Sequence, residues 1–161
     1  MCTSLLLVAL FLPSAALAES PEWMKYNDGL IASVEANKPV AVFIGQGKQG
    51  WEQLSREGKL DQETQKYLKA NYVCVYLDAE EDARLASAFA IEGTGLVISD
   101  AGGRKQAFRH EGNLANDQLV GYLKKYSDPE REARFTESTQ VRERPSYYYP
   151  PVQSAAPVCR T

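Results

Sequence analysis

The apolar run Val40 to Ile44 constrains the fold of this 161-residue chain more than any other stretch. It follows Pro39, is rich in β-branched residues and shows no polar alternation, so it predicts a strand covered on both faces. A glycine-containing turn at residues 45–50 then leads into a polar segment, in which Trp51 and Leu54 stand at helical spacing. A buried strand followed directly by a helix predicts an α/β domain.

The first 18 residues predict an export signal. Leu5 to Leu12 is a short apolar core, and the small residues Ala16 and Ala18 suit a cleavage site before Glu19. The core is short for a bilayer span, so a retained anchor is the weaker alternative. We therefore expect an exported protein of the periplasm, cell envelope or extracellular space, with no stable membrane span once the signal is removed.

The exported chain retains Cys74 and Cys159. Cys74 lies within the apolar residues 72–77, a strand by composition, where it is expected to be a small buried hydrophobe. Cys159 lies in a Pro-rich terminal segment, where it is a possible intermolecular thiol in an oxidising compartment. The cysteines and the single histidine, His110, do not have zinc-site spacing, and residues 78–82 lack the glycine of an EF-hand loop. No metal or cofactor is predicted.

Hydrophobic spacing predicts the other helices and strands. Ser20-Pro21-Glu22 is typical of a helix start, and the stripe Trp23, Tyr26, Leu30 and Val34 predicts a helix ending near Asn37. The helix after the turn is expected to be long, with a bend near Gly58. The remaining predictions are a strand at 72–77, a short helix around 85–89, a hairpin of strands at 96–98 and 105–110, and a final helix reaching 126.

The hairpin's second strand is expected to form the edge of the sheet, with a solvated His110 at its end. From residue 127 onward the chain is poor in aliphatic residues, and residues 127–161 are predicted to be a flexible tail. Tyr147, Tyr148 and Tyr149 within it are a possible contact for a partner, although an unstructured tail is the simpler interpretation. The formal net charge is −3 with both signs interspersed, so no nucleic-acid surface is predicted.

Several short segments, in this order and spacing, resemble exported thioredoxin-like proteins that have a bent active-site helix. The segments are Lys38-Pro39-Val40, residues 67–73, Leu77-Asp78, residues 89–94 and residues 100–104. The resemblance covers about residues 22–126. It implies a domain at residues 19–126 with a three-layer sandwich, in which a mixed central sheet carries helices on both faces.

The resemblance places the family's two active-site cysteines at Lys48 and Trp51 of the segment Lys48-Gln49-Gly50-Trp51. Neither an ammonium nor an indole can act as the nucleophilic or the resolving thiolate. The family's cis-proline position is occupied by Gly95, after Thr94. Because a cis bond before a non-proline costs about 2.5–4 kcal/mol, the Thr94–Gly95 bond is expected to be trans.

We interpret the chain as a redox-inactive binding or scaffold module with no catalytic residue. Its candidate binding surface comprises Lys48, Gln49, Gly50, Trp51, Thr94 and Gly95, and its partner is expected to be a protein or peptide. For Trp51, packing of the helix onto the sheet is the competing interpretation. The alternative function is a thiol-disulfide oxidoreductase that uses Cys74 or Cys159 in place of the missing pair.

Overall fold

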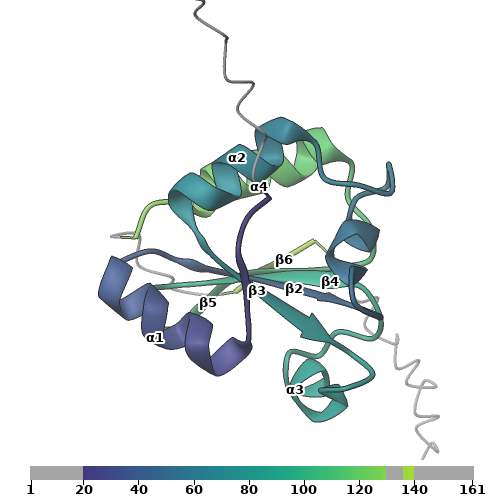
Figure 1. Cartoon of the computed structure of the whole chain (residues 1–161), viewed down its shortest axis with the longest axis horizontal. Coiled ribbons are helices and arrows are strands. Elements are labelled where there is room, and N and C mark those ends of the chain that lie inside the picture. The colour runs from purple at the N-terminus through teal and green to yellow at the C-terminus, as the bar shows by residue number, and fades with distance from the viewer. Residues whose placement is uncertain (1–19, 130–135, 140–161) are drawn as a thin grey trace, which may run out of the picture.

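A mixed six-stranded sheet, in the order β1-β3-β2-β4-β5-β6, forms the centre of the molecule (Figure 1). The structure is a computed structural model that describes residues 20–129 and 136–139. The strands are β1 (Trp23–Met24), β2 (Val40–Gly45), β3 (Val73–Asp78), β4 (Gly95–Ser99), β5 (Gln106–Glu111) and β6 (Glu137–Ser138). β3 is parallel to β1 and β2, whereas β4 is antiparallel to β2 and β5.

Helices cover both faces of the sheet, so the predicted three-layer α/β architecture is confirmed. The helices are α1 (Tyr26–Ala36), the 3-10 helix η1 (Gly50–Leu54), α2 (Gln62–Asn71), α3 (Ala83–Ala88) and α4 (Asn116–Tyr126). In Figure 1, α2 and α4 lie on one side of the sheet, and α1 and α3 lie on the other.

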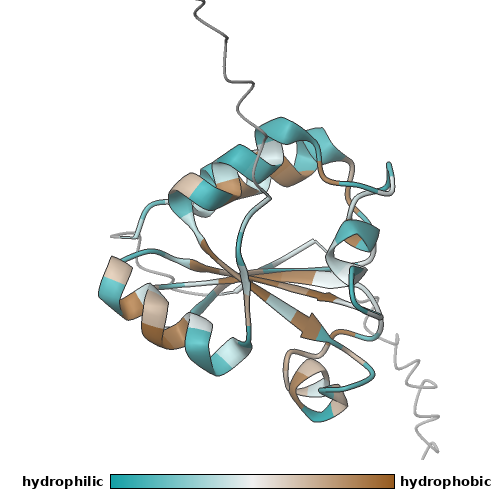
Figure 2. Ribbon diagram, in the orientation of Figure 1, coloured by the Kyte–Doolittle hydropathy of each residue, from teal (hydrophilic) through white to brown (hydrophobic). Residues whose placement is uncertain are grey.

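Two hydrophobic cores result from the alternation of side chains along the strands. Ala41 and Phe43 of β2 face the core below α2 and α4, whereas Val40, Val42 and Ile44 face the core shared with α1 and α3. All six residues of β2 are buried, which confirms the prediction of a strand covered on both faces. Figure 2 shows hydrophobic residues concentrated on the central strands and hydrophilic residues on the outer turns of α2 and α4.

The predicted start of the first helix is wrong. Trp23 and Met24 pair instead with Cys74 and Val75 at the edge of the sheet, and α1 begins only at Tyr26. Sheet pairing, together with burial of the Trp23 side chain against the α2 and α4 core, outweighs the local helix signal. The helix ends as expected, with Asn37 in the left-handed region at φ 48°.

The proposed stripe of that helix is correspondingly incomplete. Tyr26 and Leu30 pack against the sheet, but Val34 is 61% exposed. The predicted stripe has four residues on one face of the helix, and only Tyr26 and Leu30 of these four pack against the sheet from α1.

The prediction of one long bent helix after the turn is also wrong, because η1 and α2 are separate helices. The backbone N–H of Leu114 donates to the carbonyl of Leu54 at 2.7 Å, and the N–H of Arg56 donates to the carbonyl of Leu114 at 2.8 Å. These bonds to a distant segment replace the helical bonds that a continuous helix would need. α2 restarts where the Asp61 carboxylate accepts a bond from the Thr64 N–H at 2.7 Å.

β5 is not the edge of the described sheet, contrary to prediction. Glu137 and Ser138 form β6, which pairs in parallel with Phe108 and Arg109. The predicted short helix, hairpin and final helix are present as α3, β4–β5 and α4.

Some predictions fall on residues outside those that the structure describes. They are the export signal at 1–18, Tyr147, Tyr148, Tyr149 and Cys159. Within the described part of the chain, the helices are too short or too polar to cross a membrane.

Candidate functional site

The turn that joins β2 to η1 presents Lys48 and Gln49 to solvent. Two bonds fix its shape. The Gly50 N–H donates to the Gly47 carbonyl at 3.2 Å, and the Gln53 side-chain amide donates to the Gln46 carbonyl at 3.0 Å. Gln53 thus ties the first residue of the turn to η1, so the exposed side chains are carried on a defined backbone.

Two glycines allow this turn to lie directly against the sheet. A Cβ atom on Gly45 would come within 2.4 Å of the Gly50 carbonyl oxygen, and one on Gly50 would come within 2.2 Å of the Tyr76 hydroxyl. The Tyr76 hydroxyl donates a hydrogen bond to the Gly47 carbonyl. The turn is therefore held by close backbone packing of Gly50 on Gly45 of β2 and by the hydrogen bond from the Tyr76 phenol of β3.

Trp51 belongs to a cluster of aromatic side chains. Its ring stacks on Trp23 with centroids 5.0 Å apart at 26°, and it meets Tyr76 edge-on at 5.1 Å and 79°. Trp23 in turn contacts Phe43 of β2 edge-on at 5.0 Å. Trp51 is half-buried and packs against the core below α2 and α4, as the packing interpretation expects, and it also borders a pocket.

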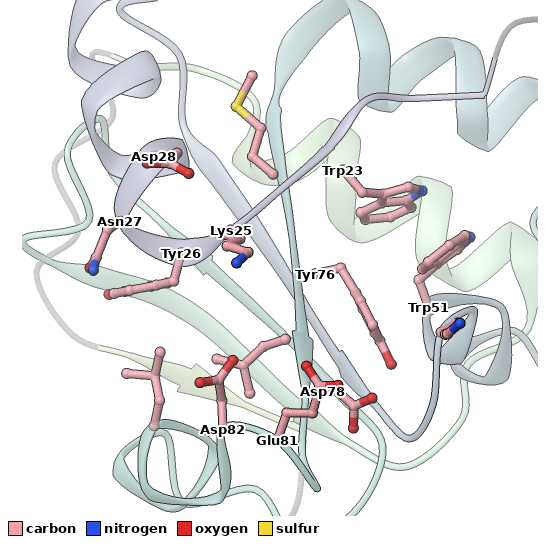
Figure 3. Close-up of a pocket in the computed structure, with 14 residues that line it drawn as sticks. Trp23, Lys25, Tyr26, Asn27, Asp28, Trp51, Tyr76, Asp78, Glu81 and Asp82 are labelled. Carbon is pink, nitrogen blue, oxygen red and sulfur yellow. The ribbon is translucent and has the colours of Figure 1, made fainter.

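This pocket, which we call the β3-edge pocket, has a volume of about 630 Å³ (Figure 3). It lies where β1 ends: β1 pairs with β3 only at Cys74 and Val75, and the chain then turns away into α1. The second half of β3, Tyr76 to Asp78, therefore has no strand beside it on this side among the described residues, and it lines the pocket.

The lining combines aromatic rings with charged groups. Its aromatic residues are Trp23, Tyr26, Trp51 and Tyr76, its carboxylates are Asp28, Asp78, Glu81 and Asp82, and its ammonium groups are Lys25 and Lys48. Figure 3 shows the two indoles side by side, with Asp78 and Glu81 closer to the hydroxyl end of Tyr76 than Asp82 is. Burial and the negative charge of Asp78 raise the pKa of Tyr76 to about 12, so its phenol is protonated at neutral pH.

The structure divides the predicted binding surface between two sides of β2. Lys48 and Trp51 line the β3-edge pocket, and Gln49 and Gly50 lie between them in the chain. Thr94 and Gly95 do not line it: Gly95 pairs with Ile44 on the β4 side of β2, whereas the pocket lies on the β3 side.

Close packing accounts for a glycine at position 95. A Cβ there would approach the His110 carbonyl oxygen and the Ile91 side chain, each at 2.7 Å. The Thr94–Gly95 bond is trans, as expected, and the Thr94 carbonyl accepts a bond from the Gly112 N–H at 2.8 Å. The strand and the neighbouring loop thus fill the space that a larger residue would need.

Cys74 lies in the middle of β3 and is buried, as predicted. Burial raises the pKa of its thiol to about 12, because the thiolate would lose its hydration inside the sheet. The thiolate is the reactive form, so this group is chemically silent at neutral pH. Among residues 20–129 and 136–139, no group of three or more His, Cys, Asp and Glu side chains is arranged to hold a metal ion.

His110 is half-buried, and the prediction of a solvated histidine is wrong. Its Nδ1 atom contacts the Thr139 hydroxyl at 2.5 Å, next to β6. Burial lowers the pKa of His110. The short strand β6, which the sequence pattern did not indicate, is responsible for this cover.

Sequence reasoning missed most of the pocket. The hydrophobic spacing places Trp23 in a helix stripe, and the acidic residues 78–82 are considered only as a metal loop, which their sequence does not fit. One signal was available in β3, where Cys74, Tyr76 and Asp78 share a face and become more polar toward the end of the strand. An increase in polarity along one face of a strand indicates that the end of the strand borders solvent or a hydrated site rather than the core.

Known structures are similar to this chain in fold. A thioredoxin from Thermus thermophilus is 17% identical with a TM-score of 0.50, and the match covers 66% of this chain and 87% of that one. The DsbH oxidoreductase is 18% identical with a TM-score of 0.57, covering 74% and 93%. Chloroplastic thioredoxin z is 20% identical with a TM-score of 0.50, covering 67% and 95%. No protein-family model matches the chain, and no curated protein matches it in sequence. The domain therefore has a thioredoxin-like fold.

Proposed function

We propose that this thioredoxin-fold domain is an exported, redox-inactive module that binds a protein or peptide partner at the turn between β2 and η1. The observation that carries the proposal is the chemistry of this turn. In the thioredoxin-like alignment of the sequence, the two cysteine positions hold Lys48 and Trp51, and the turn presents an exposed ammonium and a half-buried indole. Aromatic side chains of this kind dominate binding hot spots.

The thiol chemistry of the described residues supports the same conclusion. Cys74 is 4% exposed, and it lies within β3 rather than at the start of a helix. A redox-active cysteine needs a lowered pKa and access to the disulfide that it attacks. Cys74 has neither, which counts against the alternative oxidoreductase. The other thiol of that alternative, Cys159, lies outside the described residues.

A reductase assay separates the two functions. We expect the full chain to give no catalysed reduction of the insulin disulfides by dithiothreitol, with an active thioredoxin as the positive control. Catalysed reduction that disappears in Cys74→Ala or Cys159→Ala would refute the redox-inactive proposal. Thiol titration of the Cys159→Ala variant of residues 19–161, which keeps Cys74 as its one cysteine, is the companion measurement: Cys74 should react with a colorimetric disulfide reagent only after denaturant is added.

Site-specific photo-crosslinking tests partner binding at the turn. A photoreactive residue in place of Gln49 should capture a partner from envelope extract, whereas the same residue in place of Glu35 should not. Both positions are exposed, and Glu35 lies near the far end of α1. Capture at position 49 should be lost in Trp51→Ala and retained when the chain is truncated at Ser127. Equal capture at the two positions would contradict the proposal.

Export is tested separately. Mass spectrometry of the protein recovered from the envelope or the medium should show Glu19 as the first residue. Recovery only from the cytosol with residues 1–18 intact would refute export and would leave the binding proposal standing.

A further inference from the structure

We propose that the β3-edge pocket binds an arginine side chain presented by a peptide. This inference rests on the proposed binding function and names the chemistry that the partner would supply. The feature that carries it is the meeting, in one open pocket, of an aromatic wall, a group of carboxylates and an unpaired strand edge.

The aromatic wall suits a flat cation. Trp51 is fixed between Trp23 and Tyr76, so the wall does not have to be ordered when a ligand arrives. A guanidinium is planar, weakly hydrated and stacks on aromatic faces, which an ammonium does less well. The aliphatic stem of the same side chain would contact Leu85 and the rim of Tyr26 in the pocket lining.

The charge of the lining favours a cation. Four carboxylates against two ammonium groups leave a formal charge of −2 around the pocket. No salt bridge of the described residues joins these carboxylates to Lys25 or Lys48, so they are available to a ligand. Asp78 is oriented by the Glu80 N–H, which donates to its carboxylate at 3.0 Å. Both lysines are exposed, and their flexible stems can move their charges into solvent when a cation enters.

The strand edge explains why the arginine would belong to a peptide. β3 continues for three residues beyond its pairing with β1, and those residues line the pocket. A main chain can lie along an unpaired strand edge while one side chain enters the neighbouring pocket. The volume of about 630 Å³ is in the range of small-ligand sites and is larger than one side chain requires.

The test uses the full chain and three capped tripeptides, acetyl-Gly-Xaa-Gly-amide with arginine, citrulline or lysine at the centre. Binding is followed by tryptophan fluorescence and by calorimetry. Because citrulline keeps the shape but loses the charge, the citrulline peptide should bind about tenfold more weakly than the arginine peptide. The lysine peptide should bind with an affinity between those of the arginine and citrulline peptides. Binding of the arginine peptide should weaken in 0.5 M salt, because salt screens its attraction to the carboxylates. Equal responses to arginine and citrulline would overturn the inference.

Exposed variants assign the binding to this pocket. Glu81→Gln and Asp82→Asn should each weaken binding of the arginine peptide several-fold. Glu35 is also exposed but lies outside the pocket, so Glu35→Gln should leave this binding unchanged. Trp51→Leu keeps apolar bulk without a ring face and should also weaken it. Unchanged binding in all three pocket variants would place the peptide elsewhere and refute the inference.

The outcomes distinguish this inference from the proposed function. If the crosslink at position 49 is lost in Trp51→Ala but citrulline binds as well as arginine, partner binding stands and the arginine inference fails. If the arginine peptide binds with the expected variant pattern but position 49 captures nothing, the pocket chemistry stands and partner binding at the turn fails.

Discussion

The two edges of the sheet are closed by strands of equal length and very different anchoring. β1 and β6 each have two residues, and each runs parallel to the strand beside it. β1 is held by Trp23, whose ring packs on Phe43 and Trp51 over the core. β6 is held by polar side chains at the surface: Glu137 with Lys125, Thr136 with the Gln106 carbonyl, and Thr139 with His110.

This difference shows that strand length says little about how firmly an edge is closed. Burial of a large aromatic ring contributes several times more than an exposed hydrogen bond or ion pair. The β3-edge pocket forms beside the firmly anchored edge, where its walls are fixed. A binding site benefits from such a preorganised wall because less ordering is needed on binding.

The largest expected effect comes from Trp23→Ala, which removes the anchor of β1. We expect the free energy of unfolding to fall by about 3 kcal/mol, since a large ring that packs over the core is lost. Near-ultraviolet circular dichroism should also decrease, because the stacked Trp23–Trp51 pair is broken. Urea denaturation and the dichroism spectrum measure the two effects, and a loss below 1 kcal/mol would show that the two edges are anchored alike.

The next effect concerns the turn that supports the same edge. Gly50→Ala places a Cβ within 2.2 Å of the Tyr76 hydroxyl and 2.9 Å of the Gly45 carbonyl carbon. Relief of this overlap must move the turn or the phenol, at about 1–3 kcal/mol. The matched control is Gly121→Ala at an exposed position of α4, where a Cβ meets nothing within 4 Å. That variant should instead stabilise the domain by about 0.5–1 kcal/mol, and equal effects at the two sites would contradict the packing argument.

A smaller effect is expected at the opposite edge. A chain that ends at Pro129 lacks β6 and loses its two-residue pairing with β5, its polar side-chain contacts and its cover over His110, but no large apolar side chain of the described structure. Its melting temperature should fall by less than about 5 °C. Hydrogen exchange should show faster exchange along β5 and unchanged exchange along β3. Unfolding of the truncated chain at room temperature would show that β6 is as essential as β1.

The sequence predicts those parts of the fold in which many residues repeat one pattern. β2, β3, the β4–β5 hairpin and α4 follow from hydrophobic spacing and from turn residues. Both edge strands were missed because two residues carry no periodicity, and their pairing is set by the strand beside them. The sequence places a bend near Gly58 but does not predict that η1 and α2 are separate helices. The hydrogen bonds that separate them join Leu114 to Leu54, which accepts, and to Arg56, which donates, and these residues are far apart in sequence.

The site was predictable only in part, for the same physical reason. Lys48 and Trp51 follow directly after β2, so local order alone brings them to the end of that strand. Trp23, Tyr76 and Glu81 join them through the sheet order β1-β3-β2, which the sequence does not display locally. Gly95 was predicted only from its place in the thioredoxin-like pattern, and the structure adds a packing reason for glycine there, because a Cβ would overlap the His110 carbonyl oxygen and the Ile91 side chain.

The smallest effect is a pH dependence at the β6 edge. Burial holds the pKa of His110 below its ordinary value of 6.5, so the unfolded chain takes up a proton at this site more readily than the folded one. His110 therefore gives full stability above about pH 6.5, and that stability is lost as the pH falls through the folded pKa. Urea midpoints at pH 7.5 and pH 5 measure the change, with His110→Gln as the variant that removes it.

The His110→Gln result also decides which edge responds to pH. A glutamine does not titrate, so the difference between the two midpoints should shrink in this variant, while the protection of the β1 and β3 amides from hydrogen exchange, taken relative to the intrinsic rate at each pH, stays the same. Within the wild-type chain, the loss of protection at pH 5 should be confined to β5 and β6, because the Thr139 contact with His110 lies there. If β3 lost protection at pH 5 instead, the aromatic edge would be the weaker one and the contrast between the two edges would be reversed.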